Sequence, residues 1–290
     1  MSSEYEKLVI SLTPEAIIKK WPEITPLKKI SGIPRSSGSD TSVSTSQEDL
    51  DLFNGHDEEQ IRLMDELCIV LDYDDKPLGA GTKKLCHMME NINQGLLHRA
   101  FSVFLFNQSG KLLLQQRADE KITFPSMWTN TCCSHPLCVP LELGLNLQKG
   151  VTDVNLLSNA IAGAKVAAQR KLYHELGILS EDVPIENFTY LTRIHYQSAS
   201  GDEKTSLWGE HEIDYILILR TKDDITINTN DNEVKDYKYV SANELKEMFN
   251  DHTLVFTPWF KLICQTFLFK WWDSLNNLDQ FKDDEIHRLL

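Results

Sequence analysis

The 290-residue chain has few cysteines, a deficit of positive charge and no long uninterrupted apolar run. Six cysteines are too few for a disulfide framework in a chain of this size, and Met1–Ser11 lacks the cationic and apolar regions of a secretion signal. We therefore expect reduced thiols and a cytoplasmic protein. The C-terminal residues Arg288, Leu289 and Leu290 are not a clear peroxisomal address, so a peroxisomal location stays open.

Basic residues are outnumbered, with 29 Lys and Arg against 43 Asp and Glu, and the net charge is −14. This balance opposes general binding to nucleic acid or to an anionic membrane. The apolar stretch 253–272 is interrupted by Pro258, Lys261 and Lys270, which predicts a packed aromatic helix instead of a membrane span. We expect a small-molecule partner, held by local cations or metal ions, and a monomeric protein.

The composition divides the chain into three predicted parts. Residues 1–30 form a short helical appendage, because Thr13-Pro14-Glu15 has the chemistry of a helix start and Pro22 ends that helix. Residues 31–55, which begin with a Ser/Thr-rich stretch poor in large apolar side chains, form a flexible linker. Residues 56–290 form the catalytic domain, with the aromatic helix near its C-terminus.

Within this domain the pattern predicts an α/β sandwich with a mixed β-sheet. Asn107–Gly110 has the composition of a hairpin turn between two of the apolar runs. The predicted strands cover residues 67–73, 101–106, 111–116, 189–196, 212–219 and 236–240.

The strongest helix is predicted over 155–176, with Gly177 placed to end it. At 100° per residue Lys171 and His174 turn away from the apolar stripe, whereas Glu175 lies on it. A carboxylate on the buried face needs a metal or a basic partner, unless it reaches water at the edge of the stripe. The stripe consists of Ile161, Ala164, Ala168, Leu172 and Glu175.

Glu210 and Glu212 are two residues apart at the start of a strand, so both carboxylates lie on one face and call for a cation between them. A solvated acidic strand edge, continued by Asp214, is the alternative. His87, His98 and His135 can complete a five- or six-coordinate divalent metal site if the fold brings them together.

Several cations precede or follow the predicted strands near these residues. Lys83 and Lys84 come shortly before His87, and Arg117 and Lys121 follow the strand at 111–116. Their grouping in an acidic chain favours phosphate capture, although solvated surface charge is the common fate of a single lysine.

The run from Arg170 to Ile178, RKLYHELGI, resembles the end of the Nudix box, but Lys171 and His174 occupy two of its three glutamate positions. Nudix hydrolases gather several Mg²⁺ ions on those carboxylates to attack a diphosphate with water. With Glu175 alone remaining, diphosphate hydrolysis is disfavoured, and diphosphate binding through one Mg²⁺ is retained.

That combination resembles the type I isopentenyl-diphosphate isomerases of eukaryotic type, which have a Nudix-like α/β/α sandwich with a mixed β-sheet. The resemblance extends from about Leu67 to Trp272. Its most specific pieces are Gly95–Phe101, Thr129–Pro136, Trp208–Glu212 and Phe256–Phe260.

The resemblance implies an enzyme that moves a double bond in an isoprenoid diphosphate, with the following site residues. Cys133 and Glu212 transfer protons, and Tyr196 and Trp259 assist them. The substrate-binding residues are Lys83, Arg117, Lys121 and Ser134. Mg²⁺ on the diphosphate is held by Glu175, and a second divalent metal (Zn²⁺, Mn²⁺ or Mg²⁺) is held by His87, His98, His135, Glu210 and Glu212.

Two other functions are compatible with parts of this pattern. A Nudix-type pyrophosphohydrolase would release phosphate from its substrate, but it would need the carboxylate-rich helix end that Lys171 and His174 replace. A non-catalytic binding protein would not need Cys133, Glu212 and the five metal positions together.

Overall fold

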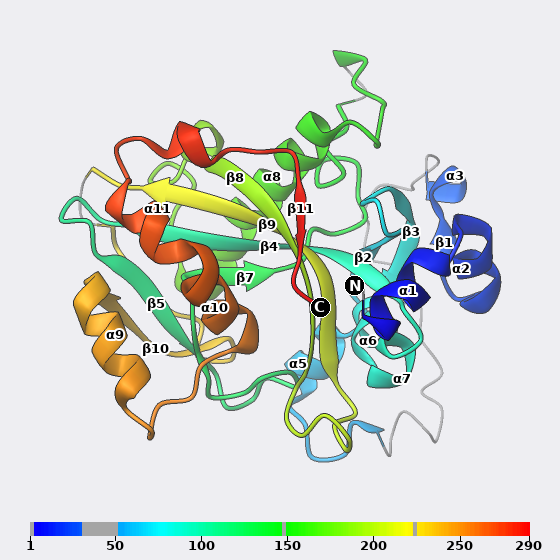
Figure 1. Ribbon diagram of the computed structural model, residues 1–290, viewed down its shortest axis with the longest axis horizontal. Helices are drawn as coiled ribbons and strands as arrows, with labels where there is room; N and C mark the ends of the chain where they lie inside the picture. Colours follow the sequence, from blue (N-terminus) through cyan, green and yellow to red (C-terminus); the bar gives the residue numbers. More distant parts are fainter. Residues whose placement is uncertain (1–2, 31–51, 147–148, 223–224) are drawn as a thin grey trace.

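The computed structural model describes residues 3–30, 52–146, 149–222 and 225–290 (Figure 1). Residues 31–51 of the predicted linker lie outside the described residues. In the part of the chain that the structure describes, no helix is long and apolar enough to cross a membrane.

Two long parallel strands form the centre of the mixed sheet. They are β4 (Leu97–Phe106) and β9 (Gly209–Arg220), paired from His98 opposite Glu212 to Phe106 opposite Arg220. On one side the sheet continues antiparallel through β2 (Leu67–Leu71) and β3 (Pro77–Thr82). On the other side β8 (Thr189–Ala199) pairs antiparallel with β9, and β11 (Ile286–Arg288) pairs parallel with β8.

The expected hairpin after β4 closes through one residue pair, Phe106 opposite Leu112. The strand β5 (Leu112–Arg117) then leaves β4 and pairs with β10 (Val234–Val240) and with β6 (Trp128–Thr129). The reason is that β7 (Cys132–Ser134) pairs with β4 at residues 101–103 and so takes the place that a full hairpin would use.

Alternate residues of β4 enter two different cores, as the two-residue period of a buried strand requires. Phe101, Val103 and Leu105 pack toward α8 (Leu157–Leu176), where Ala164, Ala168 and Leu172 are buried. Phe104 and Phe106 pack on the opposite face against α10 (Pro258–Ile263), a π-helical turn (Cys264–Leu268) and α11 (Phe269–Asp273). The predicted α/β/α sandwich is thus confirmed, and the aromatic helical segment packs against the sheet (Figure 1).

Helix α8 ends as predicted at Gly177, which has φ of 63°. A Cβ atom there would collide with the carbonyl oxygen of Asn228, so glycine suits both the left-handed turn and the close approach of the next loop. The smaller helix α9 (Ala242–Asn250) follows β10 and begins with a capping box between Ser241 and Glu244.

The N-terminal segment packs beside β3. Its elements are α1 (Glu4–Ser11), α2 (Pro14–Lys20), β1 (Thr25–Pro26) and α3 (Leu27–Ile30). Thr25 and Pro26 pair with Ala80 and Gly79, and Trp21 donates its indole N–H to Asn91 at 2.9 Å. Three short helices, α5 (Glu58–Leu63), α6 (Lys83–His87) and α7 (Met89–Ile92), flank the entry to the central strands.

Candidate active site

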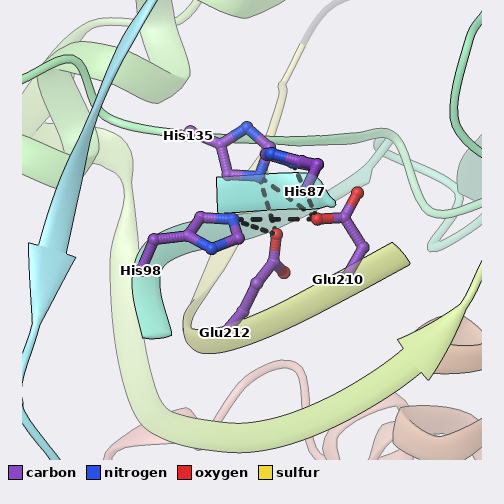
Figure 2. A group of neighbouring side chains, drawn as sticks. All are labelled: His87, His98, His135, Glu210 and Glu212. Atoms are coloured by element: carbon purple, nitrogen blue, oxygen red, sulfur yellow. Dashed lines mark hydrogen bonds and ion pairs between the residues drawn. The ribbon is translucent and has the colours of Figure 1, made fainter. Parts of the chain in front are cut away.

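Five side chains from three secondary-structure elements and one loop converge at the N-terminal ends of β4 and β9 (Figure 2). His87 ends α6, His98 begins β4, Glu210 and Glu212 begin β9, and His135 follows β7. One nitrogen or oxygen atom from each side chain can be chosen so that all five lie within 4.8 Å of one another. The structure therefore brings together all five residues expected to bind the second metal.

The strand register places the two carboxylates. His98 lies opposite Glu212 across β4 and β9, and Tyr196 lies opposite Glu212 across β8 and β9. Glu210 and Glu212 are each 5% exposed, and Asp214 is 1% exposed and accepts a hydrogen bond from Ser102 at 2.7 Å. The solvated acidic edge is therefore wrong for these residues, because buried carboxylates need positive partners.

The contacts around His87 test whether a metal fits this group. Its Nδ1 is 2.7 Å from the carbonyl oxygen of Lys83, which can only accept, so Nδ1 carries the proton. Its unprotonated Nε2 then faces Oε2 of Glu210 at 2.9 Å. Two acceptors at this distance need a cation between them. Both atoms are buried and lack hydrogen-bond partners, so a nitrogen- and oxygen-liganded divalent metal fits.

Electrostatics agree with this fit. Burial lowers the pKa of His87 to about 4, so its imidazole is neutral and available as a ligand at pH 7. Burial alone would lower the pKa of His135 as well, but Glu210 and Glu212 raise it to about 9. The two carboxylates therefore create a strong local preference for positive charge.

A chain of hydrogen bonds fixes the strands behind this group. Arg288 donates to Nδ1 of His195 at 2.7 Å, and Nε2 of His195 is 2.8 Å from Nε2 of His211. Nδ1 of His211 is 2.7 Å from the carbonyl oxygen of Leu96. Because an arginine only donates and a carbonyl only accepts, His195 carries its proton on Nε2 and His211 on Nδ1. Both histidines are thus neutral, and they hold β8, β9 and the start of β4 together.

Tyr196 and Glu212 both line the pocket beside the metal group. The Tyr196 hydroxyl donates to Oε2 of Glu212 at 2.6 Å, and both side chains are buried. Burial raises the pKa of Tyr196 well above its usual value, so the hydroxyl keeps its proton. Although burial and Glu210 would raise it, hydrogen bonds from His135 and His98 hold the pKa of Glu212 below its usual value.

Cys133 approaches the same pocket from β7. Cys132 points to the core under α8, whereas Cys133 packs against the opposite core, as alternate strand residues do. Burial raises the pKa of Cys133 to about 12, so the side chain is a protonated thiol at neutral pH. The Thr129 hydroxyl lies 3.8 Å from its Sγ.

Asn130 connects the backbone of Cys132, next to Cys133, with Trp259. Its amide nitrogen donates to the carbonyl oxygens of Cys132 and Val103, at 2.9 and 3.2 Å, and its oxygen accepts the indole N–H of Trp259 at 3.2 Å. The indole is also 5.0 Å from the Phe124 ring in an edge-to-face arrangement. Trp259 is therefore held in one orientation at the pocket wall.

Four cations line one wall of the pocket, which we call the cationic wall: Lys83, Arg117, Lys121 and Lys171. Arg117 donates to the carbonyl oxygens of Thr123 and Phe124, at 2.8 and 2.9 Å, and its guanidinium is 5.9 Å from the centre of the Trp259 ring. Lys121 is buried and its ammonium is 2.5 Å from Glu233. Positive charge and the aromatic wall thus meet at Arg117.

The orientation predicted for Lys171 is wrong. Its side chain is buried, lies 3.2 Å from Oε1 of Glu175, and lines the pocket. Although burial would lower the pKa of Lys171, Glu233 and Glu175 raise it above the usual value, so the ammonium is retained. Glu175 is on the buried face as expected, with Lys171 and Gln115 as its partners. At 100° per residue Lys171 lies about 40° from both Ala167 and Glu175, which are buried, so its position belongs to the buried face and the lysine pairs there with Glu175.

One pocket collects these groups, with an empty volume of about 400 Å³ that includes its open mouth. It contains the expected proton-transfer pair, both expected aromatic side chains, four cations and part of the metal group; His87 and His98 are not in its wall. The lining residues are Lys83, Arg117, Lys121, Thr123, Cys133, Ser134, His135, Lys171, Glu175, Tyr196, Glu210, Glu212 and Trp259.

Three residues with evident positions around the site were missed from the sequence: Asn130, Lys171 and Glu233. Asn130 lies inside the specific Thr129–Pro136 run, and this was the available signal. Glu233 is in a loop before β10 and its sequence neighbourhood gives no indication of Lys121, which is more than 100 residues away.

Comparison with known proteins gives close relatives over the whole chain. The sequence matches the NUDIX domain family over residues 162–260. It is 77% identical to isopentenyl-diphosphate delta-isomerase of Candida albicans, with 100% of both chains covered. It is 53% identical to isopentenyl-diphosphate Delta-isomerase 1 of Bos taurus, with 80% of this chain and 96% of that protein covered.

Several solved structures of Nudix proteins are also similar to this chain. A NUDIX hydrolase from Alicyclobacillus acidocaldarius aligns with a TM-score of 0.44 and 9% identity, covering 63% of this chain and 96% of that one.

Proposed function

We propose that this chain, which belongs to the isopentenyl-diphosphate delta-isomerase family and contains a Nudix domain, interconverts isopentenyl diphosphate and dimethylallyl diphosphate in isoprenoid biosynthesis. The observation that carries the proposal is one pocket lined by two sets of side chains of different chemistry. Cys133 and Glu212 line it together with Trp259, and Lys83, Arg117 and Lys121 line it with Lys171. A hydrocarbon and a diphosphate need such a pair of neighbouring environments.

Moving the double bond requires that one proton is added to the terminal carbon of the alkene. Another proton is removed from the CH₂ group on the other side of the substituted alkene carbon. Protonation of the terminal carbon gives a tertiary carbocation, and loss of the second proton forms the new double bond. Cys133 and Glu212 are the proposed pair, acting on opposite faces of the substrate. The protonated thiol and the ionised carboxylate are the forms that can give and take a proton.

The direction of Glu212 is set by its contacts. Tyr196 donates to one carboxylate oxygen at 2.6 Å, and His135 lies 2.7 Å from the other. When bound by His87, His98, His135, Glu210 and Glu212, a divalent metal would supply positive charge that favours the carboxylate form. Glu212 thereby serves as metal ligand and proton carrier.

The carbocation needs stabilisation that a proton donor alone does not give, since acid–base catalysis contributes about 10² to 10⁴-fold. The Trp259 ring lines the pocket in a fixed orientation, and the face of an indole near a desolvated cation contributes ~2 kcal/mol or more. The Tyr196 ring, 6.1 Å from that of Trp259, adds to this aromatic surface. Burial of both rings limits the access of water, which would convert the cation into an alcohol.

The diphosphate is proposed to lie against the cationic wall with Ser134, and Glu175 is proposed to help hold its Mg²⁺. Glu175 fits this role because its carboxylate is ionised: burial would raise its pKa, but Lys171 lowers it. Lys171 occupies a glutamate position of the Nudix box and adds positive charge to the same wall. This supports binding of the diphosphate without its cleavage.

The test is incubation of the purified protein with isopentenyl diphosphate, Mg²⁺ and D₂O. We expect dimethylallyl diphosphate carrying carbon-bound deuterium, detected by NMR, and no release of inorganic phosphate or pyrophosphate. Phosphate release without isomerisation would instead identify a pyrophosphohydrolase and refute the proposal.

A further inference from the structure

A buried carboxylate lies directly behind the cationic wall of the pocket. Glu233, in the loop before β10, is 3% exposed, and its Oε2 is 2.5 Å from the ammonium of Lys121. Lys121 lines the pocket and Glu233 does not. The carboxylate therefore contacts a proposed diphosphate-binding group without lining the pocket itself.

Glu233 is held in place by α5. Gln60, also 3% exposed, donates from its amide nitrogen to Oε1 of Glu233 at 3.3 Å and to Asn232 at 2.7 and 3.0 Å. The Asn232 amide donates in turn to Asp57, which caps the start of α5. Both oxygens of the Glu233 carboxylate thus have partners, and its rotamer is fixed from outside the pocket.

The main chain of Glu233, like its side chain, bonds to the loop that follows β5 and carries Lys121. Its carbonyl oxygen accepts the N–H of Ala118 at 3.0 Å, next to Arg117. Nearby, the N–H of Asn230 donates to the carbonyl oxygen of Glu175 at 3.0 Å, at the end of α8. The loop around Glu233 therefore joins the two chain segments that carry Lys121 and Glu175.

The charges explain why Lys121 needs this partner. Lys83, Arg117 and Lys171 also face Lys121 and repel it. Burial lowers the pKa of Lys121 to about 8, even though Glu233 opposes this change. Without the carboxylate, the ammonium would be less stable at this position and its flexible side chain would lose its fixed direction.

We propose that Glu233 is a positioning residue for diphosphate binding, which holds the Lys121 ammonium at the pocket wall without touching the substrate. This inference rests on the proposed function only through the role of Lys121. Replacement of the carboxylate should therefore weaken diphosphate binding more than it slows the chemical step, which a general loss of structure would not do.

The experiment measures binding of inorganic pyrophosphate with Mg²⁺ by calorimetry for four variants of the full chain: Glu233→Gln, Lys121→Met, the double variant, and Asp119→Asn. Asp119 is the matched control. It is on the same loop as Lys121 and pairs with a lysine, Lys235, but it lies outside the pocket wall. Thermal unfolding is measured in parallel.

We expect Glu233→Gln to weaken pyrophosphate binding on the order of tenfold, since it removes a charge-assisted contact to the binding group. It should raise KM for isopentenyl diphosphate by a similar factor and change kcat by less than about threefold. Asp119→Asn should change neither value. The double variant should bind pyrophosphate little more weakly than Lys121→Met, because Glu233 forms its close ion pair with Lys121, whereas Lys171 is held at 3.2 Å by Glu175.

The inference would be overturned if Glu233→Gln bound pyrophosphate like the wild type, or if Glu233→Gln weakened binding by the same factor in Lys121→Met as in the wild type. Either result would leave the proposed function intact. If Lys121→Met binds pyrophosphate normally, both this inference and the assignment of Lys121 to the diphosphate are wrong. If Glu233→Gln does not fold, Glu233→Asp provides the same test, because it keeps the charge and draws it one methylene away from Lys121.

Discussion

The hydrogen bond from Tyr196 to Glu212 permits a quantitative prediction for the chemical step. Tyr196→Phe removes one oxygen atom and keeps the ring that lies 6.1 Å from Trp259. The bond is 2.6 Å long and both partners are buried, so water cannot replace the lost hydroxyl without a new cavity. A hydrogen bond to a charged group contributes about 1.5 to 3 kcal/mol. If the bond is needed in the transition state, kcat should fall roughly 10- to 150-fold.

The assay is conversion of labelled isopentenyl diphosphate at saturating Mg²⁺, with kcat and KM determined separately. KM should change little, because Tyr196 is proposed to orient Glu212 and not to bind the diphosphate. Tyr190→Phe is the control, since it removes the same atom from the same strand in the core under α8. Wild-type kcat in Tyr196→Phe, or a loss confined to KM, would refute the assigned role of the bond.

Two further predictions concern Cys133 and Lys121. Cys133→Ala should abolish isomerisation while Cys132→Ala, in the opposite core, retains it; equal losses would show that the wrong thiol was assigned. Pyrophosphate affinity should decrease from pH 7 to 9, as Lys121, with a pKa of about 8, loses its proton among Glu233, Lys83, Arg117 and Lys171. Lys121→Arg should lack this part of the decrease, measured by calorimetry in identical buffers, because arginine stays charged; identical pH profiles would contradict the assignment.

The sequence predicts local elements well where one strong signal sets them. Helix α8 was expected over 155–176 and is found at Leu157–Leu176, because its alanine-rich stripe and Gly177 agree on the same boundaries. Strands β2, β4, β5, β8, β9 and β10 followed from apolar runs in the same way, whereas β3 (Pro77–Thr82), which contains a proline and two glycines, was not expected. The partial hairpin after Asn107–Gly110 did not follow, since the short strand β7 competes for the edge of β4 and has too few residues to be visible as a pattern.

The site residues were predictable by type and not by position in space. His98 and Glu212 are 114 positions apart, and parallel pairing of β4 with β9 brings them together at 3.3 Å. A local sequence pattern cannot reveal which distant strands pair. The prediction that these five side chains share one metal site therefore depended on the resemblance to a family. Lys171 was misplaced for a different reason: its position lies on the same helix face as Ala167 and Glu175, and a charged side chain is not expected on a buried face unless a partner such as Glu175 is known.

Lys171 also bears on how a Nudix fold can keep a diphosphate intact. A hydrolase of this fold needs several carboxylates at the end of the helix to hold the metal ions that activate water. Here the helix end supplies Glu175 with the Lys171 ammonium 3.2 Å away, and the nearby Glu233 carboxylate is neutralised by Lys121. Each of these two buried carboxylates is thus paired with a lysine, which leaves less negative charge to collect additional metal ions. Glu210 and Glu212 pair instead with histidines and not with a lysine, and a metal bound there would act on the carboxylate proposed to carry the proton.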